Sequence, residues 1–171
     1  MKNILKIRME DKIVKKDLIN TFESVKEVVR KIEGRSRAGL MLGLQELGAY
    51  MNGFVGAYYP VESNIIVMNK TILRRINETN PELLKPYSFH ILLHEYIHSL
   101  GVVDEYAAKQ KTYEISRKYF GEDHLVTEFS KDMRKFLPYL VYPIYGWMPE
   151  KQTPIELVKG FDRSSTRGYI A

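Results

Sequence analysis

The 171-residue sequence contains no cysteine and no long apolar run, and both absences narrow what the protein can be. Without cysteine, disulfides, thiolate metal sites, iron–sulfur clusters and cysteine nucleophiles are all excluded. The densest apolar runs, 38–44 and 89–93, fall well short of the roughly 18 residues that a membrane-spanning helix needs. The first twelve residues become charged too soon to form the apolar part of a signal peptide. We therefore expect a cytoplasmic protein with no membrane partner.

The sequence also has little charge of a single sign in any one place. It carries 26 basic and 21 acidic residues, and the basic residues are scattered with acids between them. Because nucleic-acid-binding surfaces usually gather lysine and arginine into one patch, no nucleic-acid partner is expected. A hydrophobic share of 44% is enough for a packed core. The length is typical of one domain, 1–171, in which residues 163–171 are expected to form a loose tail.

The order of the apolar residues predicts an α+β fold with a helical C-terminal half. Strands are expected over 3–9, 53–59 and 65–68, and a turn at 60–64 makes the last two a hairpin. Helices are expected over 17–32, 71–77, 88–101, 104–120 and 123–136. Ser88 is the expected N-cap of the third of these helices, and Gly101 is its expected stop. The segment 38–51 is ambiguous, since its leucines fit a helix but its three glycines weaken one.

The helix expected over 88–101 contains the sequence His-Glu-Tyr-Ile-His at 94–98, an H-E-x-x-H motif. At about 100° per residue, His94 and His98 lie about 40° apart, so both imidazoles project from one face and can reach one ion. Glu95 lies beside this face, where it can hold a water without being a ligand. His94 and His98 are therefore the candidate zinc ligands, and Glu95 is the candidate general base.

The residues after the motif extend it to H-E-x-x-H-x-x-G-x-x-D, in which Gly101 and Asp104 follow His98 by three and six residues. This string resembles the signature of the metzincin metallopeptidases, with aspartate where most members have histidine, as in the snapalysin-like enzymes. The resemblance implies a zincin-like fold, in which an edge strand of a small mixed or antiparallel sheet lies over the active-site helix. The hairpin over 53–68 is correctly placed in the chain for that strand. The resemblance also implies that Asp104 is the third zinc ligand.

Other assignments of the third ligand remain open. Asp104 is equally suited to be the N-cap of the helix over 104–120. His124 follows a helix break at Gly121 and could fold back over the site as the alternative third ligand. Glu105 begins a Glu-x-x-Ala stretch that resembles the glutamate ligand of the gluzincins, although the interval from His98 is far shorter than theirs.

These features predict zinc-dependent hydrolysis of peptide bonds, with one Zn²⁺ per chain and a peptide or protein as the substrate. Glu95 would act as the general base that activates a water. The alternative is a catalytically silent or regulatory zinc-binding module that senses a partner or cleaves one specific substrate.

Overall fold

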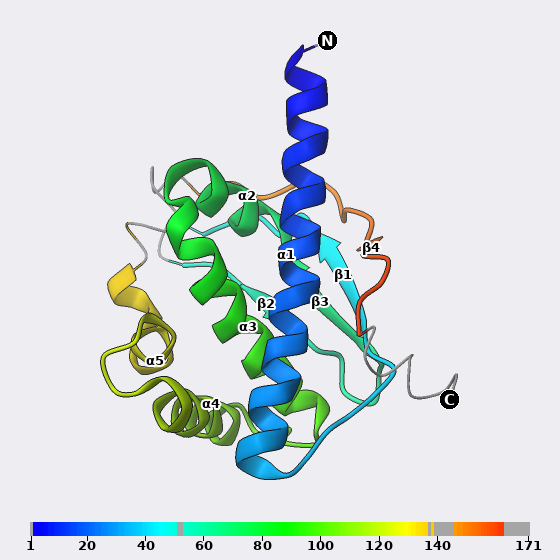
Figure 1. Ribbon diagram of the computed structural model, residues 1–171. Coiled ribbons are helices and arrows are strands. Elements are labelled where there is room, and N and C mark those ends of the chain that lie inside the picture. The colour runs from blue at the N-terminus through cyan, green and yellow to red at the C-terminus, as the bar shows by residue number, and fades with distance from the viewer. Residues whose placement is uncertain (1, 51–52, 137, 139–145, 163–171) are drawn as a thin grey trace.

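The computed structural model describes residues 2–50, 53–136, 138 and 146–162, and the tail at 163–171 lies outside them. Within these ranges the fold is α+β, as predicted, with five α-helices and a small mixed sheet of four strands (Figure 1). In chain order the elements are α1 Lys2–Glu33, β1 Met41–Gln45, β2 Ala57–Tyr58, β3 Ile65–Asn69, α2 Lys70–Thr79, a 3₁₀ turn Pro81–Leu83, α3 Leu84–Ser99, α4 Glu105–Phe120, α5 Leu125–Lys131, a 3₁₀ turn Met133–Phe136 and β4 Glu156–Leu157. None of the described helices is long and apolar enough to cross a membrane.

The sheet has the strand order β2-β3-β1-β4. β1 and β3 are parallel, whereas β2 pairs antiparallel with β3 and forms the predicted hairpin. β1 occupies part of the segment that the sequence left ambiguous. Its residues Leu42 and Leu44 are almost completely buried, as expected for an inner strand that reads as a continuous apolar run. β2 lies at one edge of the sheet and contacts α3.

The hydrophobic core joins α1, α3 and the sheet. On α1, Leu18, Phe22, Val25 and Val29 recur at three- and four-residue steps, and all four are buried. The ring of Phe22 meets Tyr96 of α3 edge-on, with 5.5 Å between the ring centroids. α3 is therefore held by its apolar face, and its histidines occupy another face.

α1 is one continuous helix, so the strand predicted over 3–9 is wrong. Ile4 and Ile7 continue the helical spacing of Val14 and Leu18 rather than the two-residue period of a strand. Extending a helix that already exists adds one hydrogen bond per residue and needs no new nucleation. The apolar residues at the beginning of the sequence therefore form the first turns of the same helix.

α3 begins at Leu84, and the prediction of Ser88 as its N-cap is wrong. Pro86 lies in the first turn of α3, where a proline is tolerated because the backbone N–H groups there have no partner within the helix. Ser88 lies one turn further in, and its hydroxyl is buried without a hydrogen-bond partner in the described structure. The helix predicted over 123–136 is also interrupted, since α5 ends at Lys131 and a 3₁₀ turn follows.

The predicted stop at Gly101 is confirmed, and it reverses the chain toward α4. Gly101 has a φ of +100°. Its N–H donates to the carbonyl of His98 at 3.0 Å, and the N–H of Val102 donates to the carbonyl of Ile97 at 3.4 Å. This pair of bonds is the Schellman motif, whose left-handed residue is usually glycine.

We expect Gly101→Ala to lower the free energy of unfolding by about 1 kcal/mol, because the left-handed backbone is strained for a residue with a Cβ atom. No atom lies within 4 Å of the position of that Cβ, so the loss would come from the backbone and not from a clash. Urea denaturation measures it. Gly53→Ala is the control, since Gly53 is equally open but has no positive φ. Equal effects of the two substitutions would contradict this account.

Candidate metal centre

Three side chains bring their ligand atoms together where α3 is followed by α4: His94, His98 and Glu105. The Nε2 atoms of the two histidines are 3.1 Å apart. The Glu105 carboxylate lies against both, with Oε1 at 3.1 Å from His94 Nε2 and Oε2 at 3.0 Å from His98 Nε2. Two imidazoles and one carboxylate form a donor set that can hold a metal ion.

Acceptors behind the two imidazoles orient them. His98 Nδ1 is 2.7 Å from the carbonyl oxygen of Val102, which can only accept, so Nδ1 carries the proton. His94 Nδ1 is 3.5 Å from Oγ1 of Thr112, whose own hydrogen is donated to the carbonyl of Ala108. Both Nε2 atoms therefore present lone pairs to each other and to Glu105. Acceptors in these positions are what metal-binding histidines usually have behind them.

This arrangement fits a divalent cation. Two lone pairs and a carboxylate that face one another repel unless a positive charge lies between them. Four-coordinate zinc holds nitrogen and oxygen ligands at about 2.0–2.2 Å, which places the ligand atoms about 3.3 Å from one another. The three separations between His94, His98 and Glu105 are close to that value. Other divalent metals accept the same donor types, so the donor set does not name the metal.

The structure does not bring the other two candidate ligands into this group. Asp104 is the N-cap of α4, and its Oδ1 accepts the backbone N–H of Ala107 at 2.8 Å. His124 is the N-cap of α5, where its Nδ1 accepts the backbone N–H of Val126 at 3.2 Å. The His124 ring also stacks on Phe120 at 4.3 Å between centroids. Both side chains are thus bonded at helix ends.

Glu105 reaches the histidines because Asp104 is the cap. With Asp104 outside the helix, Glu105 is the first residue of α4. A carboxylate in the first turn is also favoured by the positive end of the helix dipole. The signal for this choice was present in the sequence, since aspartate is among the strongest N-cap residues and a cap at 104 leaves 105 free.

Two of the three candidate ligands, His94 and Glu105, line a cleft of about 650 Å³. One wall is formed by residues 53–57, which lead into β2 at the edge of the sheet. Residues 129–134, from α5 and the 3₁₀ turn after it, form another wall. α3 lies between the walls and lines the cleft with His90, Ile91, His94 and Glu95.

Glycine allows the strand wall to approach α3 closely. A Cβ atom on Gly56 would lie 2.8 Å from Cδ1 of Ile91 and 3.0 Å from the hydroxyl of Tyr87. Such distances are too short for an ordinary contact, so a larger residue at position 56 would require either these side chains or the segment 53–57 to shift.

Glu95 lines the cleft and is only 6% exposed. Burial raises its pKa to about 7, a shift that His98 opposes and Glu105 reinforces. Its carboxylate makes no hydrogen bond or ion pair with the described parts of the chain. The carboxylate is therefore available to a water or ligand in the cleft.

Two further polar residues adjoin the site without belonging to the motif. Thr112, on α4, orients His94 as described above. His90 lies one turn before His94, and its Nδ1 is 3.1 Å from Oγ of Ser130. Burial lowers the pKa of His90 to about 3, so its ring is neutral at physiological pH. Thr112 could not be assigned from sequence, because its position depends on which helix packs against α3, whereas His90 lies on the same face of α3 as His94 by its spacing alone.

The chain matches no protein-family model, no curated protein and no solved structure. What supports a function is therefore the geometry of the site itself.

We expect Glu105→Gln to lower the zinc content sharply, from about one per chain, whereas Asp104→Asn leaves it unchanged. The first change removes a ligand carboxylate, while the second preserves the N-cap, because asparagine caps as well as aspartate does. Elemental analysis after dialysis distinguishes the two variants. Zinc lost from Asp104→Asn and kept by Glu105→Gln would reverse the assignment. His124→Asn, another cap-preserving change, should also keep its zinc.

We expect Thr112→Val to weaken zinc binding about tenfold, because it removes the acceptor behind His94 while keeping the side-chain volume. Competition with a chromogenic chelator measures the affinity. Thr127→Val is the matched control, since Thr127 is equally buried and its hydroxyl donates to the carbonyl of Gly121, away from the ligands. An equal loss of affinity in both variants would indicate a general loss of stability instead.

Proposed function

We propose that this protein is a zinc-dependent peptidase, in which His94, His98 and Glu105 hold the metal and Glu95 moves the proton of the attacking water. The observation that carries the proposal is the convergence of three ligand atoms beside a buried carboxylate that has no other partner in the described structure. His94, Glu95 and Glu105 all line the same cleft. A centre of this composition suits the hydrolysis of a carbonyl compound.

A zinc ion held by these residues would act as a Lewis acid on a substrate carbonyl and on water. Glu95 would carry out the proton transfers. Its carboxylate would accept the proton that water loses as it attacks the carbonyl carbon, and would deliver that proton to the departing amine nitrogen. Burial keeps bulk solvent away from the carboxylate, and the absence of a competing hydrogen bond in the described structure leaves both its oxygens free.

The shape of the cleft favours a peptide over a small substrate. β2 is an edge strand, and the segment that leads into it forms one wall of the cleft. Edge strands have unpaired backbone groups, which an extended peptide can pair with as an additional strand. A peptide held in this way would pass over Glu95 and the candidate ligands. The zincin-like classification is part of this proposal, since it rests on the motif and the edge strand together.

We expect Glu95→Gln to retain zinc and to lose hydrolysis by a factor of about 10²–10⁴, the usual contribution of a general base. The measurements are elemental analysis and the cleavage of a fluorogenic peptide library. Glu82→Gln, an exposed change outside the cleft, is the matched control and should keep full activity.

Two outcomes would contradict the proposal in different ways. Full activity in Glu95→Gln would remove Glu95 from the mechanism. Stoichiometric zinc without cleavage of any peptide by the parent protein would favour the alternative, a regulatory zinc-binding module.

A further inference from the structure

The first half of α1 extends beyond the rest of the molecule (Figure 1). Its apolar side chains are exposed: Leu5 is 59% exposed, Met9 64% and Ile13 57%, and Ile4 and Ile7 are both 57% exposed. An isolated helix as short as the first half of α1 has only marginal stability in water unless an apolar face packs against another surface. This part of α1 therefore presents an apolar surface that no described part of the chain covers.

Leu5, Met9 and Ile13 lie on one side of the helix, whereas Ile4 and Ile7 lie on the side of Leu18. Leu5, Met9 and Ile13 are four residues apart, so each is rotated by about 40° from the previous one. Met9 lies nine residues before Leu18, which is half a turn around the helix axis. Since Leu18 is buried in the core, the side chain of Met9 faces directly away from it.

Lysines occupy the same side of α1. Lys6, Lys12 and Lys16 all fall within about 60° of Met9 around the helix axis. Together with Leu5, Met9 and Ile13 they form what we call the outer stripe. Within the outer stripe three apolar side chains alternate with three cationic ones, and the stripe contains no acidic residue.

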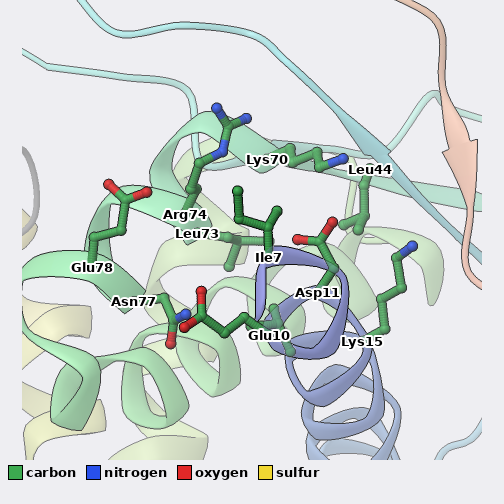
Figure 2. Close-up of a pocket in the computed structure, with 11 residues that line it drawn as sticks. Ile7, Glu10, Asp11, Lys15, Leu44, Lys70, Leu73, Arg74, Asn77 and Glu78 are labelled. Carbon is green, nitrogen blue, oxygen red and sulfur yellow. The ribbon is translucent and has the colours of Figure 1, made fainter. Parts of the chain in front are cut away.

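The acids of this segment lie elsewhere. Glu10 and Asp11 line a groove of about 340 Å³ between α1 and α2, where Figure 2 shows the Glu10 carboxylate beside Asn77 and the Asp11 carboxylate beside Ile7. The only ion pair of an outer-stripe lysine within the described structure is Lys6 with Glu10, and it is a long contact of 3.9 Å between exposed groups. The positive charge of the outer stripe therefore stays largely uncompensated.

We propose that the outer stripe binds the surface of a membrane that contains anionic lipids, with the first half of α1 lying along it. An anionic bilayer surface offers negative charge and an apolar interior in one continuous layer. Leu5, Met9 and Ile13 would enter the boundary between headgroups and acyl chains. The lysine stems would follow them while the ammonium groups remain among the headgroups.

The occupant is not a second copy of this helix, because pairing two outer stripes would place lysines against lysines. The sequence-based expectation of no membrane partner rested on the lack of a spanning segment, and a helix that lies on the surface needs none. This proposal does not depend on the peptidase assignment, because the outer stripe and the metal centre share no residue.

Co-sedimentation of the full chain with vesicles tests the proposal. We expect binding to vesicles of phosphatidylcholine with about one third phosphatidylglycerol, and at least tenfold weaker binding to phosphatidylcholine alone, with further weakening by salt. The variant L5S/M9S/I13S should bind at least tenfold more weakly. K6Q/K12Q/K16Q should lose about a hundredfold, on the basis of roughly fivefold per lysine.

Matched controls alter the same residue types elsewhere. V61S/V103S removes two exposed apolar side chains, and K85Q/K118Q/K151Q removes three exposed lysines, all outside α1. Both controls should bind as the parent does. Circular dichroism confirms that each variant remains folded.

Three results would overturn the proposal. One is equal binding to neutral and anionic vesicles. Another is binding to heparin that needs the lysines but not the apolar residues, which would indicate a general polyanion site. The third is a dimer in sedimentation velocity that L5S/M9S/I13S abolishes, which would make a second copy the occupant.

Discussion

The turn between α3 and α4 is the constraint on which the candidate metal centre depends. Gly101 allows the chain to reverse after α3, and Val102 then places its carbonyl oxygen behind His98. Two residues later Asp104 caps α4, so that Glu105 begins the helix beside both imidazoles. The same short segment thus ends one helix, starts the next, fixes one imidazole and supplies the carboxylate. Packing of α4 on α3 adds Thr112 behind the other imidazole.

Local patterns were sufficient to predict much of this. The spacing of His94 and His98 placed both on one helical face, and the hairpin over 53–68 was ordered correctly before the helix. The third candidate ligand stayed open between the neighbours Asp104 and Glu105, although the capping preference of Asp104 favoured Glu105. Only the exact start of α4 distinguishes them, and helix ends are the least certain feature of a sequence-based prediction.

The failure at the beginning of the chain has a different cause. Three apolar residues at positions 4, 5 and 7 fit a strand or a helix about equally well, and they lie in the same continuous helix as the residues that follow. At Ser88 a strong capping residue was misleading, since the chain had already turned into a helix at Leu84. In both cases the helix to which the residues belong determined their structure, although their local sequence also suited a strand or an N-cap.

The charges of the site also bear on the stability of this corner of the fold. Two imidazole lone pairs and the Glu105 carboxylate converge, and the buried Glu95 carboxylate lies close enough for Glu105 to raise its pKa. A divalent cation would offset this repulsion and link the ends of α3 and α4. Metal binding and local folding are then coupled, as they generally are where ligands come from separate elements.

α3 carries the two candidate histidine ligands and also lies between the two walls of the cleft. A tilt of this helix would move the histidines and alter the opening together, so the two cannot be adjusted independently. The size of the cleft can then be changed independently only through side chains of the walls, such as Phe54 and Met133. Substitutions in the walls could therefore change the cleft without moving the histidines.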